Sequence, residues 1–234
     1  MYIKEYEFRY GDLNRRGNIK ISTVLDILQE AAILHSAAVG YDTEKLAEMK
    51  IAWLLEGWRL RFDATLHNRS KVTVKTGIMT IKTCESNRGY EVWQDGERKI
   101  IATADWFTMN TEKRRIARIP QECIDAFDKV DEPDNGLLFE RFKPLEEIET
   151  IDTRKVEKRD IDTNNHMNNV KSVEILLDYL PDDFKMKELN VRYRKELIAG
   201  ESITVCRKET EDGFALELKN DSGDACVMMI AKGE

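Results

Sequence analysis

An internal repeat constrains the fold of this 234-residue chain more than any other feature of its sequence. Aligning Asp12 with Asp162 places DLNRRGNIKIS, residues 12–22, over DTNNHMNNVKS, residues 162–172. Asp, Asn, Asn and Ser recur at matching positions of the two segments, and Arg16 falls on the position of His166.

A second pair of similar segments follows in the same order. LRFDATLHNRSKVTV, residues 60–74, matches VRYRKELIAGESITV, residues 191–205, when Leu60 is aligned with Val191. In this alignment Thr65 lies opposite Glu196. Two matches in the same order indicate that the chain is a duplicated unit.

The sequence pattern of each copy predicts one long helix followed by several strands. An apolar stripe with helical spacing runs over residues 22–39 and stops at Gly40, and a second runs over residues 169–180 and stops at Pro181. Alternating segments, separated by short polar turns, predict the strands. The strands cover residues 2–10, 60–64, 90–94 and 100–109, then 191–194, 214–219 and 225–231, with turns such as Asp95-Gly96 between them.

A sheet wrapped around a single helix is the economical way to bury the apolar faces of both. The sequence therefore predicts the α+β class and a double hot-dog architecture, in which two tandem domains each wrap an antiparallel sheet around a central helix. We expect an N-terminal domain over residues 1–128, a charged, proline-containing linker over residues 129–147, and a C-terminal domain over residues 148–234. A short helix is expected near residues 121–127.

Charge and composition exclude several classes of protein. The net charge of −7 argues against a general nucleic-acid binder, and no apolar run approaches the ~18 residues that a membrane-spanning helix needs. No apolar signal-peptide core follows Met1. The cysteines, which are Cys84, Cys123, Cys206 and Cys226, form no CxxC pair, so we expect free thiols and a cytoplasmic location.

The segment RDIDTNNHMNN, residues 159–169, carries polar side chains at alternate positions. In an extended segment these side chains would line one wall. The set comprises Asp160, Asp162, Asn164, His166 and Asn168.

Metal binding and helix capping are two interpretations of this wall. The segment begins like an EF-hand loop, but Asn165 stands where that loop needs glycine and Lys171 stands where it needs a bidentate glutamate. A zinc site fails because His166 is the only histidine of its half and no cysteine lies near it in the sequence. We therefore expect no metal, whereas Asn168 or Asn169 can simply cap the helix that follows.

A catalytic interpretation uses the whole segment. A loop that leads into a helix N-terminus offers N–H groups and a positive dipole end to an oxyanion. A carboxylate, a carboxamide and an imidazole beside it can orient and deprotonate a water for acyl transfer. No G-x-S-x-G nucleophile elbow occurs in the chain, so hydrolysis through activated water or a carboxylate is the expected route.

Three motifs resemble those of the acyl-acyl-carrier-protein (acyl-ACP) thioesterases, the family of the plant plastid FatA and FatB enzymes and their shorter bacterial relatives. DIDTNNHMNNVKS is similar to the family's D-x-D-x-N-x-H-x-N-N signature, and VRYRKE is similar to its Y-R-[RK]-E strand. ADWFTMNTEKRRIARIPQE, residues 104–122, resembles the segment that closes the first hot-dog domain. The resemblance runs from residue 6 to residue 230.

The resemblance implies a thioesterase that hydrolyses fatty acyl-ACP to free fatty acid and holo-ACP and so terminates fatty acid synthesis. It implies no cofactor, since the 4′-phosphopantetheine arm belongs to the carrier protein. Carried over by position, the catalytic residues are Asp162, Asn164, His166 and Glu196. Leu197 stands where many plant members have a cysteine, which excludes a cysteine mechanism at that position.

Differences between the copies suggest separate roles. Because Arg16 and Thr65 replace the imidazole and the carboxylate in the first copy, we expect only the second copy to be catalytic. The first copy would then bind the acyl chain beside its long helix, although core packing explains the same apolar residues equally well. The candidate tunnel residues are Val24, Leu28, Ala31 and Ala32.

The acidic carrier protein is expected to dock on basic side chains. One candidate cluster contains Arg114, Arg115 and Arg118, and a second, near the catalytic loop, contains Lys155 and Lys158. Rival interpretations are a hot-dog acyl-CoA thioesterase, a dehydratase of the same fold, and a non-catalytic acyl-thioester sensor. Chain-length preference and oligomeric state are left open, with a homodimer as one option.

Overall fold

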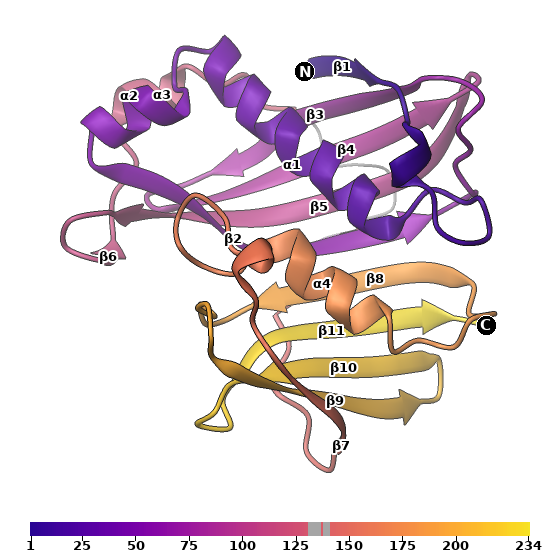
Figure 1. The fold of residues 1–234 in the computed structure, drawn as a ribbon. Coiled ribbons are helices and arrows are strands. Elements are labelled where there is room, and N and C mark those ends of the chain that lie inside the picture. The colour runs from indigo at the N-terminus through magenta and orange to yellow at the C-terminus, as the bar shows by residue number, and fades with distance from the viewer. Residues whose placement is uncertain (131–136, 138–140) are drawn as a thin grey trace. The chain divides into compact units, whose positions relative to one another are not determined.

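The chain consists of two compact units. The computed structural model describes residues 1–130, 137 and 141–234. Unit 1 comprises Met1–Glu56 and Leu60–Phe139, and unit 2 comprises Gly57–Arg59 and Glu140–Glu234 (Figure 1).

Unit 1 wraps a sheet around one long helix, α1 (Ile21–Ala38). Figure 1 shows α1 lying across the face of this sheet. The strands follow one another in the order β1-β3-β4-β5-β2, and β6 pairs with β5. The bounds of the remaining elements are β1 (Tyr2–Tyr6), η1 (Tyr10–Asp12), α2 (Thr43–Glu48), β2 (Ile51–Phe62), β3 (Val72–Ile81), β4 (Glu85–Gln94), β5 (Glu97–Asn110), β6 (Arg115–Ile116) and α3 (Gln121–Asp125).

Local sequence explains the form of these elements. Leu25 and Leu28 lie on the apolar stripe of α1 and are completely buried. The helix stops at Gly40, whose φ of 88° lets the Tyr41 N–H reach back to the Ser36 carbonyl. The hairpin between β4 and β5 turns through Asp95 and Gly96, which both have positive φ, as tight two-residue hairpins require.

Unit 2 repeats this plan around the shorter helix α4 (Asn169–Leu177), which lies across the face of its own sheet (Figure 1). Its strands follow the order β8-β11-β10-β9-β7. The other elements are β7 (Glu149–Lys155), η2 (Lys158–Asp160), β8 (Met186–Tyr193), β9 (Ser202–Thr210), β10 (Gly213–Lys219) and β11 (Ala225–Gly233).

The α+β hot-dog prediction is confirmed in both units, and most predicted elements lie close to their observed bounds. Two expectations are wrong in detail. The strand predicted over residues 2–10 ends at Tyr6, because the chain turns into the 3₁₀ segment η1. The strand predicted over residues 60–64 is β2, which begins at Ile51 and ends at Phe62, so it starts nine residues earlier than predicted.

The predicted linker, residues 129–147, is only partly described, since residues 131–136 and 138–140 lie outside the described part of the chain. Its first residues belong to unit 1, because the Val130 N–H donates to the Ile78 carbonyl at 2.9 Å. Its last residues belong to unit 2, where the Leu145 N–H donates to Glu217 at 2.7 Å. Among the described helices, none is long and apolar enough to cross a membrane.

Candidate active site

The loop between β7 and α4 in unit 2 forms a closed turn and is not extended. The Asp162 N–H donates to the His166 carbonyl at 2.9 Å, and the Asn165 N–H donates to the Asp162 carbonyl at 3.1 Å. Ile161 and Met167 pair across the loop, and Asn165 turns it with a φ of 63°. The prediction of an extended wall is therefore wrong, although the turn still brings the backbones of Asp162 and His166 together.

The Asp162 carboxylate is bound within this turn. Its Oδ1 accepts the Asn164 N–H at 2.8 Å, and its Oδ2 lies 3.4 Å from the Asn164 side-chain amide. This is the Asx-turn geometry, in which an Asp side chain accepts the backbone N–H two residues further on. The side chain of Asp162 thus shapes the loop and orients Asn164, which is exposed to solvent.

His166 and Glu196 form the second polar pair. His166 Nε2 lies 3.0 Å from Glu196 Oε2, although the two side chains come from separate segments of the sequence. The Met167 N–H donates to the Leu197 carbonyl at 2.7 Å and so fixes the loop against the segment that follows β8. Met167 and Leu197 are both buried, which anchors this connection on the core.

The exposure of this pair suits a reaction with water. The side chain of His166 is 26% exposed and that of Glu196 is 43% exposed, so solvent reaches both. An ionised carboxylate can only accept hydrogen bonds, so the contact requires a hydrogen on Nε2 of His166. With that hydrogen in place, the Glu196 carboxylate and Nδ1 of a neutral His166 are the two groups of the pair that can accept a proton.

Asn168 is the N-cap of α4, as the capping interpretation predicts. Its Oδ1 accepts the N–H groups of Val170 and Lys171 at 2.8 and 3.1 Å. The cap therefore engages two of the first-turn N–H groups that the catalytic interpretation offers to an oxyanion. The Asn169 N–H is the remaining first-turn amide for which no acceptor occurs in the described residues.

Unit 1 contains a second copy of this loop with the same backbone hydrogen bonds. The Asn14 N–H donates to the Asn18 carbonyl at 2.8 Å, and the Arg16 N–H donates to Asn14 Oδ1 at 2.9 Å. Leu13 and Ile19 pair across it, as Ile161 and Met167 do in unit 2.

These hydrogen bonds make Asn14, and not Asp12, the counterpart of Asp162, so the first sequence alignment is wrong by two positions. The letters that match in that alignment do not share a backbone environment. In unit 1, the structural counterparts of Asp162, Asn164, His166 and Asn168 are Asn14, Arg16, Asn18 and Lys20.

The second alignment, of Leu60 with Val191, is confirmed. Asp63 and Ala64 both donate to the Lys99 carbonyl, and Arg194 and Lys195 both donate to the Cys226 carbonyl. Thr65 is therefore the counterpart of Glu196. Unit 1 carries Asn18 and Thr65 at the positions of the histidine and the glutamate, so this imidazole–carboxylate pair belongs to unit 2 alone.

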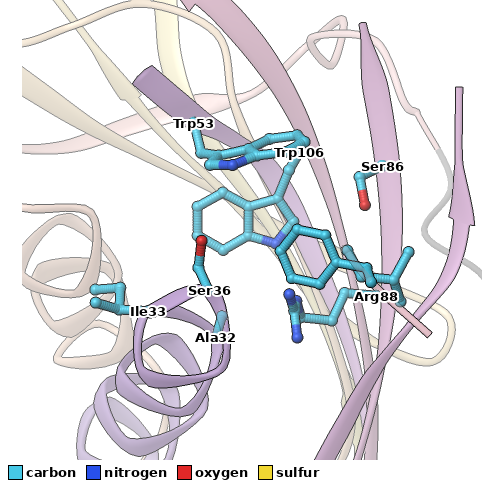
Figure 2. Close-up of a pocket in the computed structure, with 9 residues that line it drawn as sticks. Ala32, Ile33, Ser36, Trp53, Ser86, Arg88 and Trp106 are labelled. Atoms are coloured by element: carbon cyan, nitrogen blue, oxygen red, sulfur yellow. The ribbon is translucent and has the colours of Figure 1, made fainter. Parts of the chain in front are cut away.

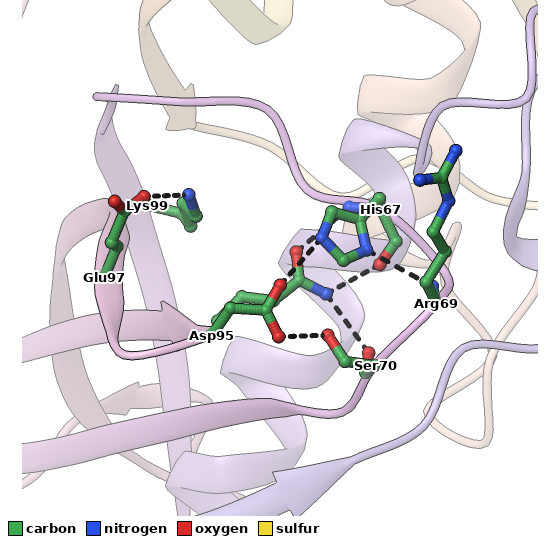
Figure 3. A network of polar contacts seen from close by, with 7 residues as sticks. His67, Arg69, Ser70, Asp95, Glu97 and Lys99 are labelled. Atoms are coloured by element: carbon green, nitrogen blue, oxygen red, sulfur yellow. Dashed lines mark hydrogen bonds and ion pairs between the residues drawn. The ribbon is translucent and has the colours of Figure 1, made fainter.

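A different histidine–carboxylate contact occurs in unit 1, where His67 Nε2 lies 2.9 Å from Asp95 Oδ2 (Figure 3). The same carboxylate accepts the Ser70 hydroxyl at 2.7 Å, and this hydrogen bond is the main reason that the pKa of Asp95 is lowered. The Gln94 side chain donates to the His67 and Ser70 carbonyls. This network ties one loop to the β4–β5 hairpin, which is a structural role.

The four predicted tunnel residues are buried in unit 1. Only Ala32 lines the cavity beside α1, which has a volume of about 60 Å³ (Figure 2). Val24, Leu28 and Ala31 belong to the core. The predicted docking residues Arg114, Arg115, Arg118, Lys155 and Lys158 are all at least partly exposed.

Sequence reasoning missed two buried polar residues of unit 1, His35 and Arg88. Arg88 NH1 donates to His35 Nδ1 at 2.8 Å, and Arg88 lines the cavity. A charged residue at an inward position of the alternating segment 86–92 was the signal that could have identified this pair. Within the described residues, no group of three or more His, Cys, Asp or Glu side chains is placed to hold a metal ion.

Family descriptions match nearly the whole chain. Residues 1–127 match the acyl-ACP thioesterase N-terminal domain, and residues 144–232 match its C-terminal domain. The chain is 23% identical over 217 residues to the chloroplastic oleoyl-acyl carrier protein thioesterase 2 of Arabidopsis thaliana, covering 83% of this chain and 59% of that one. It is also 23% identical over 214 residues to the chloroplastic palmitoyl-acyl carrier protein thioesterase of Gossypium hirsutum, covering 84% of this chain and 52% of that one. The chain thus spans between half and two thirds of the length of these curated relatives.

Two solved structures share the fold. The acyl-ACP thioesterase of Bacteroides thetaiotaomicron is 21% identical with a TM-score of 0.91, covering 100% of this chain and 98% of that one. The 12:0-ACP thioesterase of Umbellularia californica is 18% identical with a TM-score of 0.87, covering 100% of this chain and 96% of that one.

Proposed function

Since the chain belongs to the acyl-ACP thioesterase family, we propose that it hydrolyses the thioester of fatty acyl chains carried on acyl carrier protein. The products are a free fatty acid and holo-ACP, and their release ends elongation of the chain. The observation that carries this proposal is the 3.0 Å contact between His166 and Glu196. It joins an imidazole and a carboxylate that resemble the family's catalytic residues, and it leaves both open to water.

In the proposed reaction Glu196 acts as the general base. It takes a proton from a water molecule while the water oxygen attacks the thioester carbonyl carbon. His166 donates from Nε2 to the carboxylate and holds it in position. When the tetrahedral intermediate collapses, the C–S bond breaks and Glu196 returns the proton to the departing thiolate of the phosphopantetheine arm.

The negative charge on the carbonyl oxygen needs hydrogen-bond donors. The exposed side-chain amide of Asn164, oriented by Asp162, is one candidate, and the N–H of Asn169 at the start of α4 is the other. Such preorganised donors stabilise the transition state by about 3–4 kcal/mol each. The role of Asp162 is to position Asn164, since its carboxylate is already engaged within the loop.

The two units divide the work in this proposal. Unit 2 carries out hydrolysis, and unit 1 binds the end of the acyl chain in the cavity beside α1. Basic side chains that reach solvent are available to attract the acidic carrier protein, on unit 1 at Arg114, Arg115 and Arg118 and on unit 2 at Lys155 and Lys158.

A thiol-release assay tests the proposal. The same acyl chain is presented on carrier protein and on coenzyme A, for chain lengths from about C8 to C18. We expect kcat/KM to be higher on the carrier than on coenzyme A for the preferred chain. A higher kcat/KM on coenzyme A would favour the acyl-CoA thioesterase instead. Tight binding of acyl-ACP without turnover would point to the non-catalytic sensor.

A further inference from the structure

The cavity of unit 1 has a mixed lining that a plain hydrocarbon does not match. Its apolar wall is built from Trp53, Ile78, Trp106 and Phe127. Figure 2 shows the guanidinium of Arg88 reaching into the space between the tryptophans and α1. The cavity therefore combines apolar rings with a permanent positive charge.

Arg88 is buried without an anion beside it. The residue is 4% exposed, and an arginine stays protonated in proteins. Its NH1 donates to His35 Nδ1 at 2.8 Å and lies 3.4 Å from Thr76 Oγ1, and both partners are neutral. No carboxylate in the described part of the chain pairs with this guanidinium.

The donors of Arg88 are not used up by these contacts. Both described hydrogen bonds come from NH1, so Nε and NH2 have no described protein acceptor. The ring of Phe127 lies 5.9 Å from the guanidinium carbon, a weaker contact that does not replace an acceptor. The remaining N–H groups can therefore bind an oxygen that enters the cavity.

Ser86 supplies a second polar group on the same wall. It is 3% exposed, it lines the cavity, and its hydroxyl has no hydrogen-bond partner in the described residues. Ser86 and Arg88 are two positions apart on β4, so their side chains point to the same face of the sheet. Both polar groups can thus contact one bound atom or group.

We propose that this cavity binds acyl chains that carry an acceptor oxygen, a hydroxyl or a carboxylate, at the end remote from the thioester. The inference deepens the proposed function by naming its substrate class, and it rests on that function. A hydrocarbon end would take water away from Arg88 and Ser86 and leave their donors unpaired, which weakens binding by about tenfold or more for each group. An oxygen at that place satisfies them. A volume of about 60 Å³ holds roughly four water-sized groups, enough for the end of a chain.

Binding of non-hydrolysable acyl amides to the intact protein tests this inference without relying on turnover, because an amide head group has no carboxylate that could itself pair with Arg88. The probes are the mono-N-(2-acetamidoethyl) amides of dodecanoic acid, 12-hydroxydodecanoic acid and dodecanedioic acid, with the corresponding C16 set, measured by titration calorimetry. We expect the oxygenated member of at least one set to bind at least tenfold more tightly than the plain amide. Stronger binding of the dodecanedioic member indicates that the charge of Arg88 dominates, and stronger binding of the hydroxy member indicates a neutral acceptor; both outcomes support the inference.

Variants assign the preference to the cavity. Arg88→Met should abolish the preference for oxygenated chains and Ser86→Ala should reduce it, while the plain amides bind at least as well as before. Arg98→Met is the matched control, because Arg98 pairs with Glu91 at 3.4 Å, away from the cavity lining, and the preference should survive. If Arg88→Met does not fold, the inference is tested by comparing the preference for oxygenated chains in the wild type and in Ser86→Ala.

The inference is overturned if plain and oxygenated amides bind the wild type equally, or if the preference persists in Arg88→Met and Ser86→Ala. The same chains offered as carrier thioesters separate the two levels of the proposal. Hydrolysis of plain acyl-ACP without preference for oxygenated chains overturns only this inference. Absence of hydrolysis with every thioester overturns the proposed function. The binding preference is then tested by the calorimetry alone.

Discussion

Asn14 and Asp162 occupy the same position in two copies of one loop, and the Oδ1 atom of each accepts the backbone N–H two residues further on, at 2.9 and 2.8 Å. The loop therefore needs an oxygen at this position but does not need a negative charge. Unit 1 demonstrates that a carboxamide is sufficient for the fold of the turn. This relationship separates a structural role of Asp162 from a catalytic one.

The first prediction concerns Asp162→Asn. Because the carboxamide can accept the same N–H group, the melting temperature should be unchanged, and kcat/KM should fall less than about tenfold. Asp162→Ala should lose both stability, by about 1 kcal/mol, and activity, because the turn that orients Asn164 loses its acceptor. Thermal melts and thiol release measure the two effects. A loss of 10³-fold or more in a folded Asp162→Asn protein would show that the charge itself takes part in the chemistry.

The second prediction concerns the cap of α4. Asn168→Ala should destabilise unit 2 by about 1 kcal/mol, because the N–H groups of Val170 and Lys171 lose their acceptor. Asn168→Asp keeps an acceptor oxygen and serves as the control, with stability near that of the wild type. Urea unfolding followed by circular dichroism measures the difference. Equal stability of the alanine and aspartate variants would contradict the capping role.

The third prediction concerns the pH dependence of stability. Burial, together with the Arg88 guanidinium, lowers the pKa of His35 from 6.5 to about 4, with Asp128 opposing the shift. As pH falls, the unfolded chain takes up this proton before the folded protein does. The contribution of neutral His35 to the free energy of unfolding is thus complete above about pH 6.5 and is lost as the pH falls toward 4.

At pH 4.5 the loss from this group amounts to about 2–3 kcal/mol. His35→Gln keeps an acceptor for Arg88 but does not titrate. Between pH 7.5 and pH 4.5 the wild type should therefore lose about 2–3 kcal/mol more of its free energy of unfolding than the variant does. Other titrating groups occur in both proteins and cancel. Parallel pH profiles would contradict the buried, neutral state of His35.

The fourth prediction separates the two basic clusters as docking sites. Reversing two charges, either Arg115 and Arg118 or Lys155 and Lys158, should raise KM for acyl-ACP and leave kcat nearly unchanged if that cluster binds the carrier. Added salt should weaken the effect, because these side chains reach solvent and their charges are screened. An unchanged KM for acyl-ACP would show that the altered cluster does not bind the carrier protein.

Much of the fold could be predicted because its signals are local or repeated. The helical stripes placed α1 and α4 within a few residues, and the Asp95-Gly96 pair marked the β4–β5 hairpin. The repeat indicated two similar units, and the structure has two units of similar plan. Glu196 was assigned by motif position, and the structure brings it to His166 from a separate segment of the sequence.

The remainder depended on information that residue letters do not carry. Four matching letters favoured Asp12 as the counterpart of Asp162, whereas backbone hydrogen bonds give that place to Asn14. The alternating polar residues suggested an extended wall, but the positive φ of Asn165 closes the loop instead. Burial of Arg88 is a tertiary property, and the sequence signal for it is only the in-phase position of this charge with Tyr90 and Val92 on an alternating strand.

The central claim is that His166 and Glu196 act as one catalytic pair in thioester hydrolysis. It is tested most directly by a double-mutant cycle, in which thiol release from acyl-ACP is measured for His166→Ala, Glu196→Gln and the double variant. Each single substitution should lower kcat by about 10²–10⁴-fold in soluble, folded protein. The double variant should be little worse than the more damaging single variant, because residues that act as a unit are not additive. Nearly full activity in His166→Ala, or losses that simply multiply in the double variant, would contradict the claim.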